Sequence, residues 1–252
     1  MSGKNAKAQR RAKRELQTVM INGDYAARSA RAMLSLDLSA VPLTRVTQFV
    51  VGWFRAAFDQ SLLIADLSMR GRASAAAPNR RLFAELAVRL HWLHDLSRSD
   101  RPGAIDAALD WERKNQEKTF DHMRKMGWES EVDLTDMREF VLNVTDNGEV
   151  RNQAEKFAAA AYATDVKNAG LYRAWREESS YAHATGFLAG SYAPAEHDTW
   201  LDTGEPPVAD PDLEAHRLTQ LFVLTMTHRL LIQEGAPEEV ASRMFDAFMS
   251  VR

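Results

Sequence analysis

Apolar residues recur at the spacing of an α-helix in every long segment of this 252-residue chain. No stretch shows the sustained apolar–polar alternation, enriched in β-branched residues, that is typical of strands. A chain of this length can build one domain around a single core. We therefore predict an all-α protein folded as a single multi-helix bundle.

The complete absence of cysteine narrows the chemistry that the chain can perform. It excludes disulfides, cysteine-ligated zinc, iron–sulfur clusters and thiol catalysis. With 45% hydrophobic and 27% charged residues, the composition is that of an ordinary globular protein. Collagen-like and intrinsically disordered classes are excluded on the same ground.

Charge is distributed unevenly along the chain. Residues 1–14 carry six basic side chains and no acid, so the net charge of −3 leaves −9 for the remainder. The six are Lys4, Lys7, Arg10, Arg11, Lys13 and Arg14. We divide the chain into a basic N-terminal arm or helix, residues 1–20, and a helical bundle domain, residues 21–252. A body this acidic is not an electrostatic trap for polyphosphate.

The basic arm is not followed by the apolar segment that a secretory signal requires. No apolar run approaches the length needed to span a bilayer. We therefore expect no membrane partner and a cytoplasmic location.

Apolar periodicity and intervening turn residues set the expected helix bounds. The predicted helices cover residues 5–38, 44–70, 79–97, 104–126, 134–144, 151–165, 168–189, 211–234 and 237–249. The first is expected to be weakly broken near Asn22–Asp24, and Pro42 to lie in the first turn of the second. Residues 71–78 and 190–210 are expected to be loops, the second rich in proline, glycine and acidic residues.

The helix at about 211–234 is apolar on nearly all sides between Leu221 and Ile232. Such a helix is buried by neighbours all round, which predicts the central rod of the bundle. His228 lies on its apolar face, and we interpret it as a core histidine with one hydrogen-bond partner.

Two charged residues fall on the buried side of helix 79–97. Arg89 lies inside its apolar arc, and Glu85 lies at the edge of that arc, beside Trp92. Charged residues at core-facing positions must be paired. One interpretation is an internal Glu85–Arg89 ion pair, since an acid four residues before a base is the favourable orientation on a helix.

Helix 168–189 places Tyr172, Ser179 and His183 on one face. In a purely structural interpretation, Ser179 bonds to a backbone carbonyl and His183 to a buried acceptor. In a functional interpretation, these three side chains converge with Glu85 and Arg89 in one cleft between two packed helices, as sites in helical bundles commonly do.

The same segments carry a family resemblance. Arg81–Glu85, followed by an apolar run with Trp92, resembles the first signature of a bacterial all-helical family known as a domain of unknown function. Tyr172–Trp175 and Ser179–His183 resemble its second signature, an aromatic-rich helix with a Ser-x-x-x-His pattern. The resemblance covers roughly residues 45–190. It implies a helical fold and a shared Arg/Glu/Ser/His cluster, without an activity.

A weaker resemblance is to the helical HEPN ribonucleases, which carry an arginine and a following histidine on one helix. Two matches occur, Arg89-x4-His94 and Arg176-x6-His183. About two are expected by chance at this arginine and histidine content. In such a nuclease His183 would be the general base or acid, and Arg89 or Arg176 would stabilise the phosphorane charge without a metal.

A hydrolase triad of Ser179, His183 and Glu85 has suitable residue types, but its nucleophile would lie mid-helix and not on a strained turn. With no strands expected, no glycine-rich phosphate loop of the strand–helix type is available.

His91, His94 and Asp95 offer donor atoms to a metal ion. His91 and Asp95 are expected to face away from the apolar arc and His94 to lie at its flank, so we interpret them as a solvated surface group. No histidine has a glutamate three residues before it, as di-iron bundles require. We therefore expect no metal and no cofactor.

Nine acidic residues and no lysine or arginine lie between Arg176 and Arg217. Most of the acidic residues are in the loop at 190–212. Such a loop is either functional or a solvated excursion from the fold. In the functional interpretation it is a docking surface for a protein partner, such as the N-terminal arm of a neighbouring copy in a self-associated form.

The sequence therefore supports two hypotheses about the function. The first is an interaction or regulatory module with a buried Glu/Arg/Ser/His cluster. The alternative is a HEPN-like, metal-independent ribonuclease of toxin or phage-defence type, for which RNA would be the partner. The sequence leaves open whether the protein is an enzyme.

Overall fold

The structure is a computed structural model, and it describes residues 3–128, 135–141, 143–164, 169–193, 195–196, 200–201 and 211–251. The elements are α1 (Gly3–Leu34), α2 (Arg45–Met69), η1 (Ala73–Ala76), α3 (Ala77–Asp95), α4 (Arg101–Lys125), α5 (Thr135–Phe140), α6 (Gly148–Glu155), α7 (Phe157–Ala163), α8 (Ala169–Ala182), α9 (Gly186–Tyr192), β1 (Ala195–Glu196), β2 (Trp200–Leu201), α10 (Leu213–Gln233) and α11 (Glu238–Met249). The prediction of an all-α bundle is confirmed.

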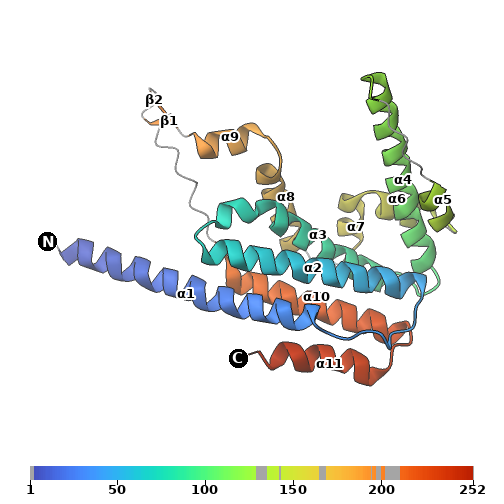
Figure 1. Ribbon diagram of the computed structural model, residues 1–252, viewed down its shortest axis with the longest axis horizontal. Coiled ribbons are helices and arrows are strands. Elements are labelled where there is room, and N and C mark those ends of the chain that lie inside the picture. The colour runs from blue at the N-terminus through green and yellow to red at the C-terminus, as the bar shows by residue number, and fades with distance from the viewer. Residues whose placement is uncertain are drawn as a thin grey trace.

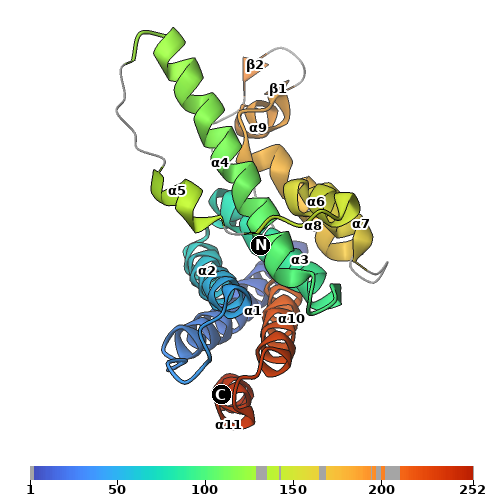
Figure 2. The ribbon, with the colours of Figure 1, turned by 90° about the vertical axis from the view of Figure 1, so that its right-hand side faces the viewer.

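The helices α1, α2, α3 and α10 run side by side and form the body of the bundle (Figure 1). The helix α2 packs against α1, α3, α4 and α10. The helix α11 covers α1 and α10, and α8 packs against α3. The helix α4 projects from one end of the bundle (Figures 1 and 2), and the first half of α1 projects from the opposite end (Figure 1). Among the described helices, none combines the length and apolar character needed to cross a bilayer.

A reciprocal cap fixes the start of α2. The Thr44 hydroxyl accepts a hydrogen bond from the Thr47 backbone N–H (3.1 Å), and Thr47 Oγ1 accepts from the Thr44 N–H (2.8 Å). This arrangement satisfies two backbone donors at the helix terminus. The prediction that Pro42 lies in the first turn is wrong, because α2 begins three residues later and the Pro42 carbonyl accepts from Thr47 Oγ1.

The helix α1 is continuous, so the break predicted near Asn22–Asp24 is absent. Gly23 is buried, and a Cβ atom placed there would lie 2.5 Å from Met69 Cγ. The glycine therefore serves the close approach of α1 to the end of α2 and does not interrupt the helix.

Two other predicted helices are divided by local caps. The segment 151–165 is two helices, α6 and α7, separated at Lys156. The segment 168–189 is α8 and α9, because the Thr185 hydroxyl accepts from the Leu188 N–H (3.1 Å) and starts a new helix. His183 consequently falls in the connection between them.

The predicted loop at 71–78 contains η1 and the first turn of α3, with Pro78 at a position where a missing N–H costs nothing. The two-residue strands β1 and β2 pair antiparallel inside the loop predicted at 190–210, which was expected to hold no strand. Most other residues of that acidic loop lie outside the described residues.

The helix α10 packs on α1, α2, α3 and α11 and begins with an Asp212 cap (Asp212 Oδ1 to the Ala215 N–H, 3.1 Å). It closes before Gly235, which has a positive φ of 89°. Leu221 and Ile232 remain 36% and 37% exposed, so the prediction of burial on nearly all sides is too strong. One flank of α10 faces solvent.

Candidate functional site

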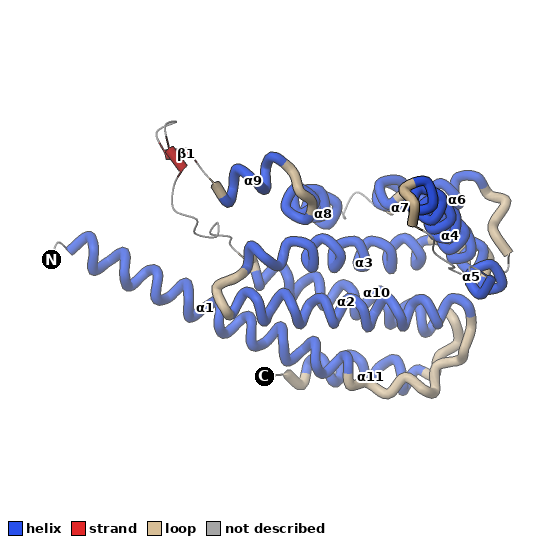
Figure 3. The backbone as a smooth tube through the Cα atoms, turned by 45° about the horizontal axis from the view of Figure 1, so that its top comes forward, coloured by secondary structure: helices blue, strands red, loops and turns tan. Residues whose placement is uncertain are grey.

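The helices α3 and α8 pack extensively on one another, and three of the six predicted site residues, Glu85, Tyr172 and Ser179, lie at their interface. Arg80 pairs with Glu178, while Glu85, further along α3, meets Trp175, earlier on α8. Figure 3 shows α8 lying above α3. We refer to Arg81, Glu85, Trp175 and Ser179 as the α3–α8 polar cluster.

Ser179 is hydrogen-bonded on both sides. Arg81 Nε donates to Ser179 Oγ (3.0 Å), and the hydroxyl donates to the Trp175 carbonyl (2.6 Å). The second bond is the backbone contact that the structural interpretation expected. A hydroxyl held by its own helix and by a guanidinium is a linker between helices, and no general base contacts it.

Glu85 is also used to join the two helices. Its Oε2 accepts a hydrogen bond from Trp175 Nε1 (3.1 Å), and the Arg81 guanidinium lies 5.3 Å from the centroid of the same indole. Tyr172 stacks on Trp175 with ring centroids 5.8 Å apart. The indole is therefore the centre of the contact, and Glu85 fixes its orientation.

Arg89 satisfies its charge away from Glu85. Its Nη1 donates to the Gln153 carbonyl (2.9 Å), and its guanidinium lies over the rings of Trp92 and Phe157. Burial lowers the pKa of Arg89, and the charges of Glu85 and Glu112 oppose that shift. The predicted Glu85–Arg89 ion pair is not formed in the described structure.

The remaining site residues do not join this cluster. Arg176 and His183 are exposed, and His183 lies one residue beyond the end of α8. It follows Trp175 by eight residues, which places it about 12 Å further along the helix axis. Glu85, Ser179 and Tyr172 are thus brought together around Trp175, whereas the predicted shared cleft with His183 is not.

A buried polar group that the sequence analysis missed lies between α2 and α10. Ser61, His216 and Gln220 are all buried, and Ser61 Oγ lies 2.8 Å from His216 Nε2. The signal was present in the sequence, since His216 and Gln220 are four residues apart and share a face with the buried Val223. The residue singled out instead, His228, is only half-buried and packs edge-on against Phe245.

The hydrogen bonds of Gln220 define the tautomer of His216. Gln220 Nε2 donates to the Ala26 carbonyl (2.9 Å) and to Ser61 Oγ (2.7 Å), which uses both of its protons. The Ser61 hydroxyl must then donate its own proton to His216 Nε2, so the neutral ring carries its proton on Nδ1. Burial lowers the pKa of His216 to about 4, and the Arg80 charge acts in the same direction.

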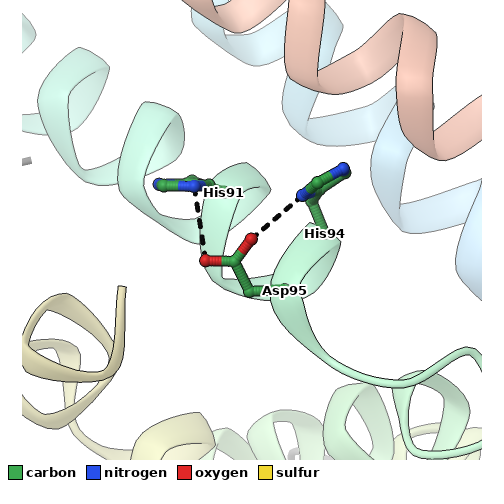
Figure 4. Close-up of side chains that lie close together, drawn as sticks. All are labelled: His91, His94 and Asp95. Atoms are coloured by element: carbon green, nitrogen blue, oxygen red, sulfur yellow. Dashed lines mark hydrogen bonds and ion pairs between the residues drawn. The ribbon is translucent and has the colours of Figure 1, made fainter. Parts of the chain in front are cut away.

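Another cluster of titratable side chains lies in the last turn of α3 (Figure 4). It consists of His91, His94 and Asp95. Asp95 lies between the two rings, with Oδ2 3.3 Å from His91 Nε2 and Oδ1 3.0 Å from His94 Nδ1. The side chains of His91 and His94 are only 14% and 20% exposed. The expected solvated surface group is therefore a compact and partly buried one.

The fold and these sites define an all-α bundle whose α3–α8 polar cluster joins two helices. No protein-family model matches the chain, and no curated protein or solved structure is significantly similar to it.

Proposed function

We propose that this protein is a helical interaction module and that the projecting half of α1 is its binding element. The observations that support this proposal are that α1 extends beyond the bundle (Figures 1 and 3) and that apolar side chains on it are exposed. Leu16, Met20 and Ile21 are 61%, 44% and 49% exposed. The packed part of the helix begins at Val19, which is partly buried against the core, and continues through the buried Gly23.

A helix of this kind gains stability from a partner. Isolated helices shorter than about 12–15 residues are marginal in water, and most helical stability in proteins comes from packing an apolar face. Leu16 and Met20 are four residues apart and share one face of α1, and a contiguous exposed apolar patch marks an interaction surface. The apolar residues 16, 20 and 21 lie beside the basic segment, so the partner surface combines an apolar contact with negative charge.

The partner that this charge pattern favours is a second copy of the chain. The first 14 residues carry six positive charges, and the rest of the chain carries −9. Complementary charge steers association and fixes its register. Docking of one arm on the acidic body of another copy, with the acidic loop at 190–212 as the contact, joins the two oppositely charged parts of the sequence.

Sedimentation velocity of the full chain at low and high salt tests this proposal. We expect a concentration-dependent dimer or higher oligomer that weakens at high salt, because exposed charge pairs are screened. The double variant Leu16→Glu/Met20→Glu should be monomeric. Leu43→Glu is the matched control, since Leu43 is 87% exposed in the α1–α2 connection. A wild-type chain that stays monomeric at all concentrations and salts would overturn the proposal.

The α3–α8 polar cluster has a structural role in this proposal. Arg81 hydrogen-bonds to Ser179 and Trp175 to Glu85 across the interface, and Ser179 also bonds to the backbone of its own helix. Their mutual contacts also support the proposed membership of the bacterial family whose two signatures they resemble, because the signatures then meet at one interface. A cytoplasmic location remains part of the proposal.

A metal-independent ribonuclease is the second candidate. It is favoured by the exposure of Arg176 and His183, which leaves both side chains accessible to a substrate. RNA cleavage by the purified protein with excess EDTA tests it. Activity that survives EDTA and is lost in a folded His183→Ala variant would support the nuclease. Since His183 is exposed, that variant should keep the wild-type melting temperature, so absent cleavage in both proteins would overturn this candidate.

A further inference from the structure

We infer that His91, His94 and Asp95 form a binding site for a divalent transition-metal ion of the zinc class at the end of α3. Each residue offers one donor atom, and the three donor atoms lie within 4.8 Å of one another. They meet because positions i, i+3 and i+4 share one side of a helix. This is the one group of three or more histidine and acidic side chains with that geometry in the described part of the chain.

The separations of the donor atoms suit a small tetrahedral ion. Zinc binds histidine nitrogen and carboxylate oxygen at about 2.0–2.2 Å, so adjacent ligands are about 3.3–3.6 Å apart. The distances from Asp95 to His91 Nε2 and His94 Nδ1 are 3.3 and 3.0 Å. Small side-chain rotations are therefore enough to place all three atoms around one ion, in the arrangement of Figure 4.

The surroundings hold the ligands and favour a positive charge. The His91 ring packs edge-on against Phe222 with centroids 5.4 Å apart, which restricts its rotation. The three residues occupy the last turn of α3, where the backbone carbonyls create a partial negative charge. The nearby Arg101 guanidinium is paired with Glu234 at 2.8 Å, so its charge is neutralised locally.

Two imidazoles and one carboxylate select the metal class. Imidazole suits zinc, cobalt, nickel and copper, whereas magnesium and calcium require oxygen ligands. Three protein ligands leave one coordination position for a water molecule. Solvent can reach that position, because the Asp95 side chain is 37% exposed. Sites with three protein ligands and one solvent ligand are typical of exchangeable or catalytic zinc.

Co²⁺ binding by the full chain after chelator dialysis tests the site. We expect one Co²⁺ per chain, a visible absorption band of low-coordinate cobalt, and displacement of cobalt by added Zn²⁺. Losing a residue that only hydrogen-bonds to a metal ligand weakens metal binding by roughly 10- to 100-fold. His91→Ala and Asp95→Asn each remove a ligand, so each should weaken Co²⁺ binding by more than that. His122→Ala is the matched control, because His122 is exposed on α4.

Wild-type protein without stoichiometric Co²⁺ or Zn²⁺ binding overturns the inference, as does unchanged affinity in the variants. If His91→Ala unfolds, as judged by circular dichroism, then His94→Gln carries the test, since His94 is at the rim of the group. The readout is independent of the oligomeric state, so failure of the metal site and failure of the proposed interaction function are distinguishable.

Discussion

The Ser61 hydroxyl donates to His216 Nε2 across 2.8 Å in the interior between α2 and α10. This bond joins residues 155 positions apart in the sequence and requires an unprotonated Nε2. The His216 ring also packs at a tilt of 43° against Phe83, with centroids 4.7 Å apart. A proton added at Nε2 would remove the acceptor that Ser61 uses and place a charge beside buried apolar groups.

Stability should therefore fall on mild acidification. The pKa of His216 is lowered to about 4 in the folded protein, whereas an unfolded histidine titrates near 6.5. Between these values the unfolded chain binds more protons, so the stability contributed by neutral His216 is present above pH 6.5 and is lost as the pH falls toward 4. The free energy of unfolding should decrease by about 2 kcal/mol from about pH 7 to pH 5.

Urea denaturation at the two pH values measures this change. The variant His216→Gln cannot take up the proton, so its free energy of unfolding should be lower at neutral pH and less dependent on pH. Equal pH dependence in the two proteins would show that other groups control the acid response.

Gly23 in α1 and Gly52 in α2 predict substitutions of opposite sign. Gly52 has open space around it on α2, so Gly52→Ala should stabilise by up to about 1 kcal/mol through helix propensity. Gly23→Ala gains the same propensity but drives its Cβ to 2.5 Å from Met69 Cγ. We expect a net loss of about 1–3 kcal/mol from overpacking. Thermal and urea denaturation of both variants provide the comparison, and stabilisation by Gly23→Ala would contradict the close packing of α1 on α2.

Helix identity was predictable from sequence where the signal is local, and helix continuity was not. Gly235 ends α10 through its positive φ, as expected for a glycine after a helix. The apolar pattern of 168–189 continues through His183 because α9 resumes it, so periodicity alone does not register the Thr185 cap. Gly23 was predicted to break α1 for the same reason. Its packing against Met69, which lies in another helix, cannot be read from the local sequence.

The site was harder to predict because it depends on long-range packing. The spacing of Glu85 and Arg89 indicated that charged groups lie on the buried side of α3, and they do. Their partners, however, are Trp175 and the Gln153 carbonyl, which approach only in the folded bundle. The sequence analysis missed His216 because a polar residue near the start of an apolar helix is expected to face solvent. Only the fold brings its distant partner to it.

The buried pair Arg101–Glu234 should be among the most important ionic contacts for stability. Arg101 Nη1 lies 2.8 Å from Glu234 Oε1, and Arg101 Nε donates to the Leu93 carbonyl (2.9 Å). Arg101→Met should cost about 3–5 kcal/mol, because it leaves the buried Glu234 carboxylate with only the longer, 3.7 Å contact to the exposed Arg98. The double variant Arg101→Met/Glu234→Met should lose less than the single one.

Arg98→Met is the control for that series. Arg98 lies 3.7 Å from the same Glu234, but its side chain is 67% exposed, so the expected cost is below about 1 kcal/mol. Urea denaturation of the four proteins gives the comparison. A double variant as unstable as Arg101→Met would show that the lost carbonyl contacts, and not the unpaired carboxylate, dominate.

Adjacent acids on α8 give the last prediction, because Glu178 and Glu177 differ mainly in their surroundings. Glu178 accepts two hydrogen bonds from Arg80, at 2.6 and 2.9 Å, in the partly buried α3–α8 interface. Glu177 pairs with Arg173 on the exposed side of its own helix. Glu178→Gln should cost about 1–2 kcal/mol, since it removes a two-pronged charged contact between helices. Glu177→Gln should cost about 0.3–0.5 kcal/mol, as exposed pairs four residues apart usually do. Urea denaturation of both variants measures the difference, and equal losses would mean that the Arg80–Glu178 contact does not hold α8 on α3.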